Sequence, residues 1–245
     1  MAVSPKFRLT VGKLVSVSLG IYLRNIIPFL FLGGLVMGPW IALEFWLPEA
    51  GLSEQSRALI PLGVFILQSV LTNMLTGAIT YGVVMQLRGS PAGLGDSIGK
   101  GLSSLLRVIG TGFIVAIRIF LWSLLLYVPG IIESVRLFVA LPVAVMEGKA
   151  GNSAAQRSKD LVSGSGWPVF GAYFLTMVLA FLISMIAVFL IVGFEPDFDR
   201  SNPWLSTVIT VPLSTFSSTM MAVAYFLLRK GKENVDAKEI AKIFD

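Results

Sequence analysis

Residues 118–149, near the middle of the chain, read RIFLWSLLLYVPGIIESVRLFVALPVAVMEGK and are the most informative part of the sequence about the fold. Its first half is an apolar run that contains Arg118 and leads to Pro129-Gly130, a pair typical of turns. A second apolar run follows and contains Glu133 and Arg136. Two apolar segments joined by a tight turn predict a hairpin of membrane helices with three charges deep in hydrophobic sequence.

Composition supports a membrane protein. The 245 residues are 55% hydrophobic and 13% charged, and the mean hydropathy is +0.82. Ordinary soluble domains carry about 25% charged residues, so this composition favours the lipid bilayer as the solvent. The chain has no cysteine and no histidine, which excludes thiolate nucleophiles, the usual zinc ligand sets and haem ligation by histidine. We therefore expect no metal and no other cofactor.

Six apolar stretches are long enough to be membrane helices, since roughly 20 helical residues cross about 30 Å of hydrocarbon. Before the first of them, residues 7–24 place apolar side chains at helical spacing, which predicts an amphipathic helix in the membrane interface. We predict a single all-α polytopic membrane domain over residues 1–245 with a polar tail at 229–245. The predicted transmembrane helices are residues 26–47, 58–87, 108–128, 131–146, 169–192 and 203–228.

Two further amphipathic segments, residues 96–107 and 153–166, precede the second and third pairs of apolar stretches. Each of the three amphipathic segments thus leads into a helical hairpin, which suggests a threefold internal repeat. The alternative is that short polar loops give any membrane protein this appearance.

Basic residues indicate the orientation in the membrane. Of the 19 lysines and arginines, 15 lie in the N-terminal segment, the 88–107 and 147–167 loops and the tail. The loops on the other side contain only Arg57 and Arg200. Because loops rich in lysine and arginine stay in the cytoplasm, we predict that both termini are cytoplasmic. The basic residues flank apolar runs, which favours anionic lipid headgroups over nucleic acid as their partners.

Arg118, Glu133 and Arg136 form the candidate intramembrane polar site. Glu133 and Arg136 are three residues apart and share a face of one predicted helix. Such residues are costly in hydrocarbon, by about 2.5–3.5 kcal/mol each at the bilayer centre, and are usually interior and paired. One interpretation is a structural ion pair, and the other is a ligand or ion pathway.

Polar side chains on the second predicted helix are candidates for lining a cavity, Gln68 and Asn73 among them. The alternative is that they join neighbouring helices through hydrogen bonds. Basic residues at the ends of the apolar runs are candidates for contact with lipid headgroups at about 1 kcal/mol each. These are Lys13, Arg24, Arg107 and Arg157.

The middle of the chain carries a resemblance to a known group. The motifs are Val128-Pro129-Gly130-Ile131-Ile132, Arg136-Leu137 followed by Ala140-Leu141-Pro142-Val143, and Glu147-Gly148. Ala154, Arg157-Ser158, Trp167 and Val169-Phe170 continue the pattern. It resembles bacterial multi-pass proteins that include the membrane domain fused to glycerophosphodiester phosphodiesterases.

The resemblance implies a six-helix domain of the bacterial cytoplasmic membrane with no established activity of its own. The phosphodiesterase domain of that group is a separate soluble unit, so we do not expect its activity here. Walker, G-x-S-x-G and H-E-x-x-H motifs are also missing from the sequence. We expect a non-enzymatic protein, an accessory subunit of a membrane complex or a lipid-associated scaffold. The alternative is a small transporter or lipid-handling protein that uses the polar intramembrane site.

Overall fold

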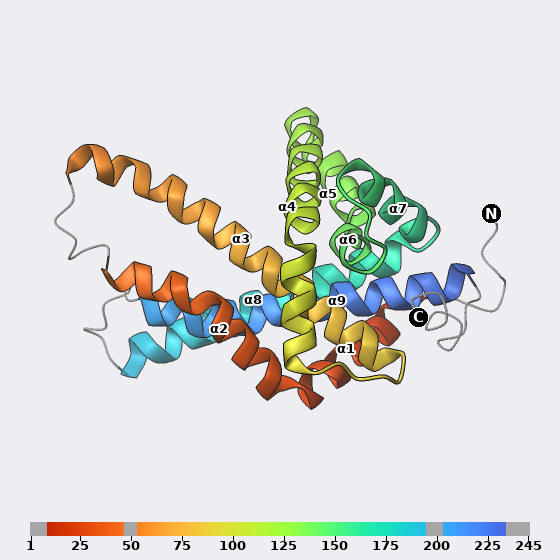
Figure 1. Cartoon of the computed structure of the whole chain (residues 1–245), viewed down its shortest axis with the longest axis horizontal. Helices are drawn as coiled ribbons and strands as arrows, with labels where there is room; N and C mark the ends of the chain where they lie inside the picture. Colours follow the sequence, from red (N-terminus) through yellow and green to blue (C-terminus); the bar gives the residue numbers. More distant parts are fainter. Residues whose placement is uncertain (1–8, 47–52, 195–202, 234–245) are drawn as a thin grey trace.

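A computed structural model of the chain describes residues 9–46, 53–194 and 203–233 (Figure 1). All regular structure in these ranges is helical. The loops at 47–52 and 195–202, and the predicted tail beyond residue 233, lie outside the described residues. The helices are α1 (Val11–Arg24), α2 (Ile26–Trp46), α3 (Glu54–Leu87), α4 (Leu94–Leu125), α5 (Tyr127–Arg136), α6 (Ala140–Met146), α7 (Asn152–Val162), α8 (Gly166–Phe194) and α9 (Pro203–Glu233).

Helix α1 is the amphipathic segment predicted before the first membrane helix. It begins after Thr10, whose hydroxyl accepts a hydrogen bond from the backbone N–H of Lys13 at 3.3 Å. Its axis meets the first part of α2 at 79°. The buried face of α1 packs against α9, where the hydroxyl of Tyr22 lies 3.2 Å from Oγ1 of Thr215. Helix α1 therefore lies across the direction of α2.

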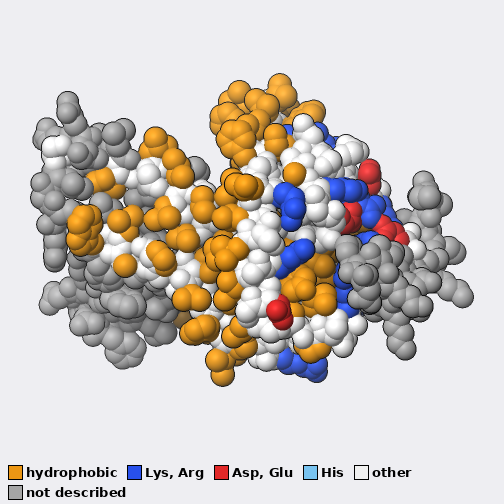
Figure 2. Space-filling view, viewed as in Figure 1, with side chains coloured by type: hydrophobic (Ala, Val, Ile, Leu, Met, Phe, Trp, Pro, Cys, Tyr) orange, Lys and Arg blue, Asp and Glu red, His pale blue; other side chains and the backbone are white. Residues whose placement is uncertain are grey.

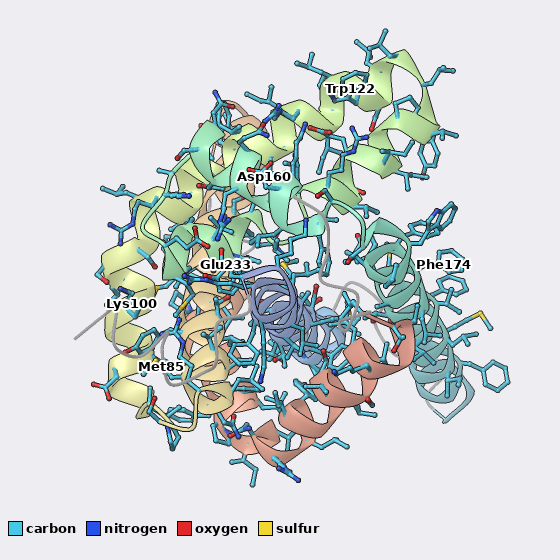
Figure 3. The ribbon with its side chains drawn as sticks, turned by 90° about the vertical axis from the view of Figure 1, so that its right-hand side faces the viewer. Met85, Lys100, Trp122, Asp160, Phe174 and Glu233 are labelled. Atoms are coloured by element: carbon cyan, nitrogen blue, oxygen red, sulfur yellow. The ribbon has the colours of Figure 1, made fainter. Side chains whose placement is uncertain are left out.

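Four long helices, α2, α3, α8 and α9, extend along the long axis of the molecule (Figure 1). Helix α9 is the centre of the core, because every side chain from Ala222 to Leu228 is buried. Viewed from the right of Figure 1, α9 is seen nearly end-on with other helices around it (Figure 3). The hydrophobic core thus surrounds the C-terminal half of α9.

Helix α4 stands across this bundle and packs tightly on α3 (Figure 1). A Cβ atom on Gly101 would lie 3.0 Å from the carbonyl oxygen of Met74, so a larger residue does not fit at this crossing. The sequence predicted a separate amphipathic element at 96–107, but the structure has one continuous helix. No proline interrupts it, and the hydroxyl of Ser104 bonds back to the carbonyl of Lys100 at 2.7 Å.

The turn predicted at Pro129-Gly130 lies instead at Leu126, which is extended with φ −162° and ψ 147°. Pro129 is the third residue of α5, where its missing N–H needs no helical partner. Pro142 likewise is the third residue of α6, and its ring would clash with the carbonyl of Phe138 in a continuous helix. The predicted helix at 131–146 is therefore two helices, α5 and α6.

The described residues contain five segments long and apolar enough to cross a membrane, or six if the bent pair of α1 and α2 counts as one. Many large hydrophobic side chains on α2, α4 and α8 are exposed. Figure 2 shows them over the left part and the top of the molecule, whereas charged side chains gather on the right half. The chain has an all-α multi-pass membrane fold.

We call the charged side of the molecule the basic end. It comprises α1, α7, Arg88 after α3, and residues 229–233 of α9 (Figures 1 and 2).

Candidate functional site

Glu133 is the centre of the candidate site. Its residue exposure is only 2%, and its carboxylate makes two ion pairs. The closer partner is Nζ of Lys159 on α7, 2.7 Å from Oε1, and Nε of Arg118 on α4 lies 3.5 Å from the same oxygen. Two cations from two other helices therefore hold one buried carboxylate.

The α4–α5 hairpin places Arg118 beside Glu133. The hairpin turns at Leu126, and the two helices then approach so closely that a Cβ on Gly130 would lie 3.0 Å from Cα of Ser123. Glycine is the one residue that lets the chain close in this way. The tight turn brings α4 and α5 side by side, and the charges on their facing surfaces come within reach.

Helix α7 is held against the same hairpin by a serine. The hydroxyl of Ser158 donates to the carbonyl of Arg136 at 2.9 Å and accepts from the backbone N–H of Val139 at 3.3 Å. These backbone groups are available because α5 ends at the Leu137–Val139 break. The bonds set the position of α7, and Lys159, the next residue, therefore lies over Glu133.

Arg136 does not join this cluster. It is the last residue of α5, its side chain is exposed, and it makes no ion pair with any described residue. The structure thus brings together two of the three residues predicted for the intramembrane site and adds Lys159. Sequence spacing missed Lys159 because it lies 26 positions after Glu133 on a polar segment.

A second ionic network lies at the basic end and joins α6, α7 and α9. Nε of Arg157 donates to both carboxylate oxygens of Glu147 at 3.0 and 3.1 Å, and its Nη2 pairs with Glu233. The hydroxyl of Tyr225 donates to Glu147 at 3.2 Å and accepts from Arg229 at 2.9 Å. Two carboxylates are therefore satisfied inside the protein by two arginines and a tyrosine.

Despite burial, the pKa of Arg157 is raised by its pairing with Glu147 and Glu233. Burial acts to lower its pKa, but hydrogen bonds to Glu233 and Glu147 outweigh burial and raise it above the ordinary value. For Arg88 the balance is reversed, because burial is the largest influence and lowers its pKa, and the charge of Arg229 lowers it further. The predicted lipid contact at Arg157 thus falls on a side chain that is already paired with two carboxylates.

The other basic residues predicted to meet lipid lie on the outer faces of α1 and α4. Lys13 and Arg24 are exposed on α1. Arg107 is half-buried on α4, where its Nη2 donates to the carbonyl of Ser103 at 3.4 Å. Lys100, about two turns earlier on α4, lies 5.9 Å from the ring centre of Tyr81.

The polar residues predicted to line a cavity serve helix packing where the structure shows their contacts. Asn73 donates to the carbonyl of Ser69 at 2.7 Å, and its amide oxygen would be 3.1 Å from a Cβ on Gly112 of α4. Gln68 is half-buried on the same helix. A cavity of about 160 Å³ lies elsewhere, and neither Gln68 nor Asn73 lines it. Its wall includes Asn25, Phe29, Gln86, Ala92, Leu94 and Ser97.

Comparison with protein-family models, with curated proteins and with solved structures gives no match for this chain. The resemblance to the phosphodiesterase-associated membrane domain therefore stays a prediction, and the functional argument rests on the geometry.

Proposed function

We propose that this chain is a non-enzymatic integral membrane protein that works by contact with anionic lipids, as a scaffold or as an accessory subunit of a membrane complex. We place it in the bacterial cytoplasmic membrane with its basic end and both termini in the cytoplasm. The observation that supports this best is the arrangement of the charges near the basic end, where most carboxylates are paired inside the protein and several basic side chains are exposed.

Three carboxylates near the basic end take part in internal ion pairs, whereas Asp96 and Asp160 are exposed. Glu133 is held by Lys159 and Arg118, whereas Glu147 and Glu233 share Arg157. Lys13 and Arg24 are exposed on α1, and Lys100 and Arg107 are partly exposed on α4, so this surface carries more basic than acidic side chains. Anionic headgroups attract such a surface by about 1 kcal/mol per basic residue near the membrane.

Helix α1 supports the same proposal through its geometry. It lies at 79° to α2, with one face buried against the bundle and Lys13 and Arg24 exposed on the other side. A helix that turns away from a membrane helix at the basic end is placed where headgroups lie. Its lysine and arginine then reach the phosphates of the same leaflet.

The transporter alternative has less support. A transport site needs polar groups that open onto a cavity, but Glu133 is buried and neutralised by two cations. The cavity of about 160 Å³ is lined by another set of residues at the junction of α2, α3 and α4. The contacts of Arg118 and Glu133 fit a structural ion pair.

The test is thermal stability of the purified protein in neutral detergent with added phosphatidylglycerol or phosphatidylcholine. We expect phosphatidylglycerol to stabilise the protein and phosphatidylcholine to have little effect. In the triple variant Lys13→Gln/Arg24→Gln/Arg107→Gln, the stabilisation should fall by about 2–3 kcal/mol, since three basic contacts are removed.

The control is Lys149→Gln, which removes one surface cation, a third of the charge that the triple variant removes. Lys149 is paired with Glu147 at 3.4 Å, so this variant should keep nearly the full response to phosphatidylglycerol. Equal stabilisation by the two lipids in the wild-type protein would overturn the proposal, and so would an unchanged response of the triple variant.

A further inference from the structure

The apolar tip of the α4–α5 hairpin is not used by the proposed function. From Leu121 to Val128 every side chain is exposed, including Leu124 at 74% and Tyr127 at 79%. A stripe of exposed residues leads back along α4 at helical spacing, formed by Phe113, Ile117, Phe120, Leu121 and Leu124. Figure 2 shows this tip as a cap of hydrophobic side chains at the top of the molecule.

We propose that the α4–α5 hairpin does not cross the bilayer but lies in the cytoplasmic leaflet, where its apolar stripe and tip are covered by lipid acyl chains. The chain then crosses the membrane four times, with α2, α3, α8 and α9. Length and composition alone also allow α4 and the α5–α6 pair to cross.

The first support is the direction of α4. Figure 1 shows α4 upright while α8 and α9 extend nearly horizontally and α2 and α3 run obliquely. In Figure 3, turned by 90°, α9 is nearly end-on, whereas α4 is seen along its length from Lys100 to Trp122. Both views agree that α4 runs across α9, so α9 and α4 cannot both follow the membrane normal.

The second support is the depth in the membrane at which Glu133 would lie if the hairpin crossed. Glu133 is seven residues beyond Leu126, which corresponds to about 10 Å of helix. If the tip reached the far side of about 30 Å of hydrocarbon, Glu133 would lie about two thirds of that thickness from the basic end. Lys159, on the polar helix α7, contacts Glu133 at 2.7 Å, and no lysine side chain is long enough to bridge such a gap.

Helix α7 follows α4 along its apolar half, which strengthens this point. The backbone N–H of Gly151, just before α7, donates to the hydroxyl of Thr111 on α4 at 2.9 Å. Near the C-terminal end of α7, Lys159 pairs with Glu133, which also pairs with Arg118 of α4. Gln156 and Asp160 of α7 are exposed. If α4 crossed the bilayer here, α7 would present these two polar side chains to hydrocarbon, which is unfavourable.

Acyl chains of the same leaflet are the occupant that fits this arrangement. An interfacial helix buries its apolar face about 5–10 Å below the headgroups, and α4 has the required stripe. Trp122 and Tyr127 at the tip are residue types enriched at membrane interfaces. The charged groups in the first half of α4, among them Lys100 and Arg107, then lie at headgroup level.

The experiment is a depth profile of α4 by spin-label electron paramagnetic resonance. The chain has no native cysteine, so single cysteines can be placed at residues 113, 117, 120 and 124 on the stripe and at 115 and 119 on the other side of α4. The full-length protein is reconstituted in vesicles of phosphatidylethanolamine and phosphatidylglycerol. Depth is measured from collisions with oxygen and with a water-soluble nickel complex.

We expect the four stripe positions to lie at one shallow depth below the headgroups. The two positions on the other side of α4 should both lie nearer to water, and by equal amounts. A depth that increases from residue 113 to a maximum and decreases again toward 124 would show a crossing helix and overturn the proposal. Low collision rates with both reagents at the stripe would show that protein covers it, which would also overturn it.

A variant that fails to fold does not compromise the test, because each position is an independent substitution of an exposed or half-buried residue. The outcome is also separate from that of the proposed function. Stabilisation by phosphatidylglycerol depends on Lys13, Arg24 and Arg107, and it is expected whether or not the hairpin crosses.

Discussion

Replacement of Lys159 by methionine removes the closest partner of a buried carboxylate. The Nζ–Oε1 distance is 2.7 Å and the Glu133 side chain is 3% exposed, so this is a close ion pair whose carboxylate is shielded from water. Loss of one partner from a fully buried pair costs about 3–5 kcal/mol. Here Arg118 remains at 3.5 Å and Lys159 itself is 22% exposed, so we expect a smaller loss of about 2 kcal/mol.

The matched control is Lys149→Met, a lysine that pairs with Glu147 at 3.4 Å but is 44% exposed. We expect it to cost less than about 1 kcal/mol, as exposed pairs do. The assay is unfolding in mixed micelles by titration with sodium dodecyl sulfate, followed by far-ultraviolet circular dichroism. The double variant Glu133→Gln/Lys159→Met should lose less than the sum of the two single variants, with a coupling of about 1 kcal/mol. Equal costs for Lys159→Met and Lys149→Met, or strict additivity in the cycle, would show that Lys159 does not stabilise the Glu133 carboxylate.

The same assay checks three further expectations. Gly101→Ala should destabilise by about 1–3 kcal/mol because the new methyl group meets the carbonyl of Met74, whereas Gly99→Ala, which meets open space, should be neutral or stabilising. Arg157→Gln should cost about 1–3 kcal/mol since two carboxylates lose a partner, and the exposed Lys230→Gln should stay within about 0.5 kcal/mol. Because the folded-state pKa of Arg157 is raised, its contribution is fully present below the unfolded-state pKa and is lost only above the folded-state value. The cost of Arg157→Gln should therefore be the same at pH 7 and pH 10, and a smaller cost at pH 10 would contradict a guanidinium that stays charged and paired at both pH values.

Composition and periodicity were sufficient to predict the class of fold. The long apolar runs are helical, and the amphipathic segment predicted at 7–24 is helix α1 (Val11–Arg24). Local signals were less reliable where proline was concerned. Pro129-Gly130 is read as a turn, but a proline at the third position of a helix marks its start, and the turn falls at Leu126.

The candidate site was predicted in part. Arg118 and Glu133 are paired, as one interpretation of the sequence held, but Arg136 is exposed and Lys159 takes its place. Helical spacing describes only neighbours on one helix, whereas the contact with Lys159 depends on how α7 packs against α5. That packing is set by Ser158 and the backbone break near Val139, which no local pattern reveals. For the same reason, the sequence alone did not show that Arg157 is paired with Glu147 and Glu233.

Side-specific labelling of Tyr127→Cys, at the tip of the α4–α5 hairpin, measures whether the hairpin crosses the bilayer. A membrane-impermeant maleimide is added to sealed vesicles of either orientation, with Ser53→Cys marking the far side and Asn152→Cys marking the basic side. We predict that Tyr127→Cys is never labelled from the side that labels Ser53→Cys, and that it reacts only from the Asn152→Cys side or after detergent is added. Labelling of Tyr127→Cys together with Ser53→Cys in intact vesicles would contradict the account.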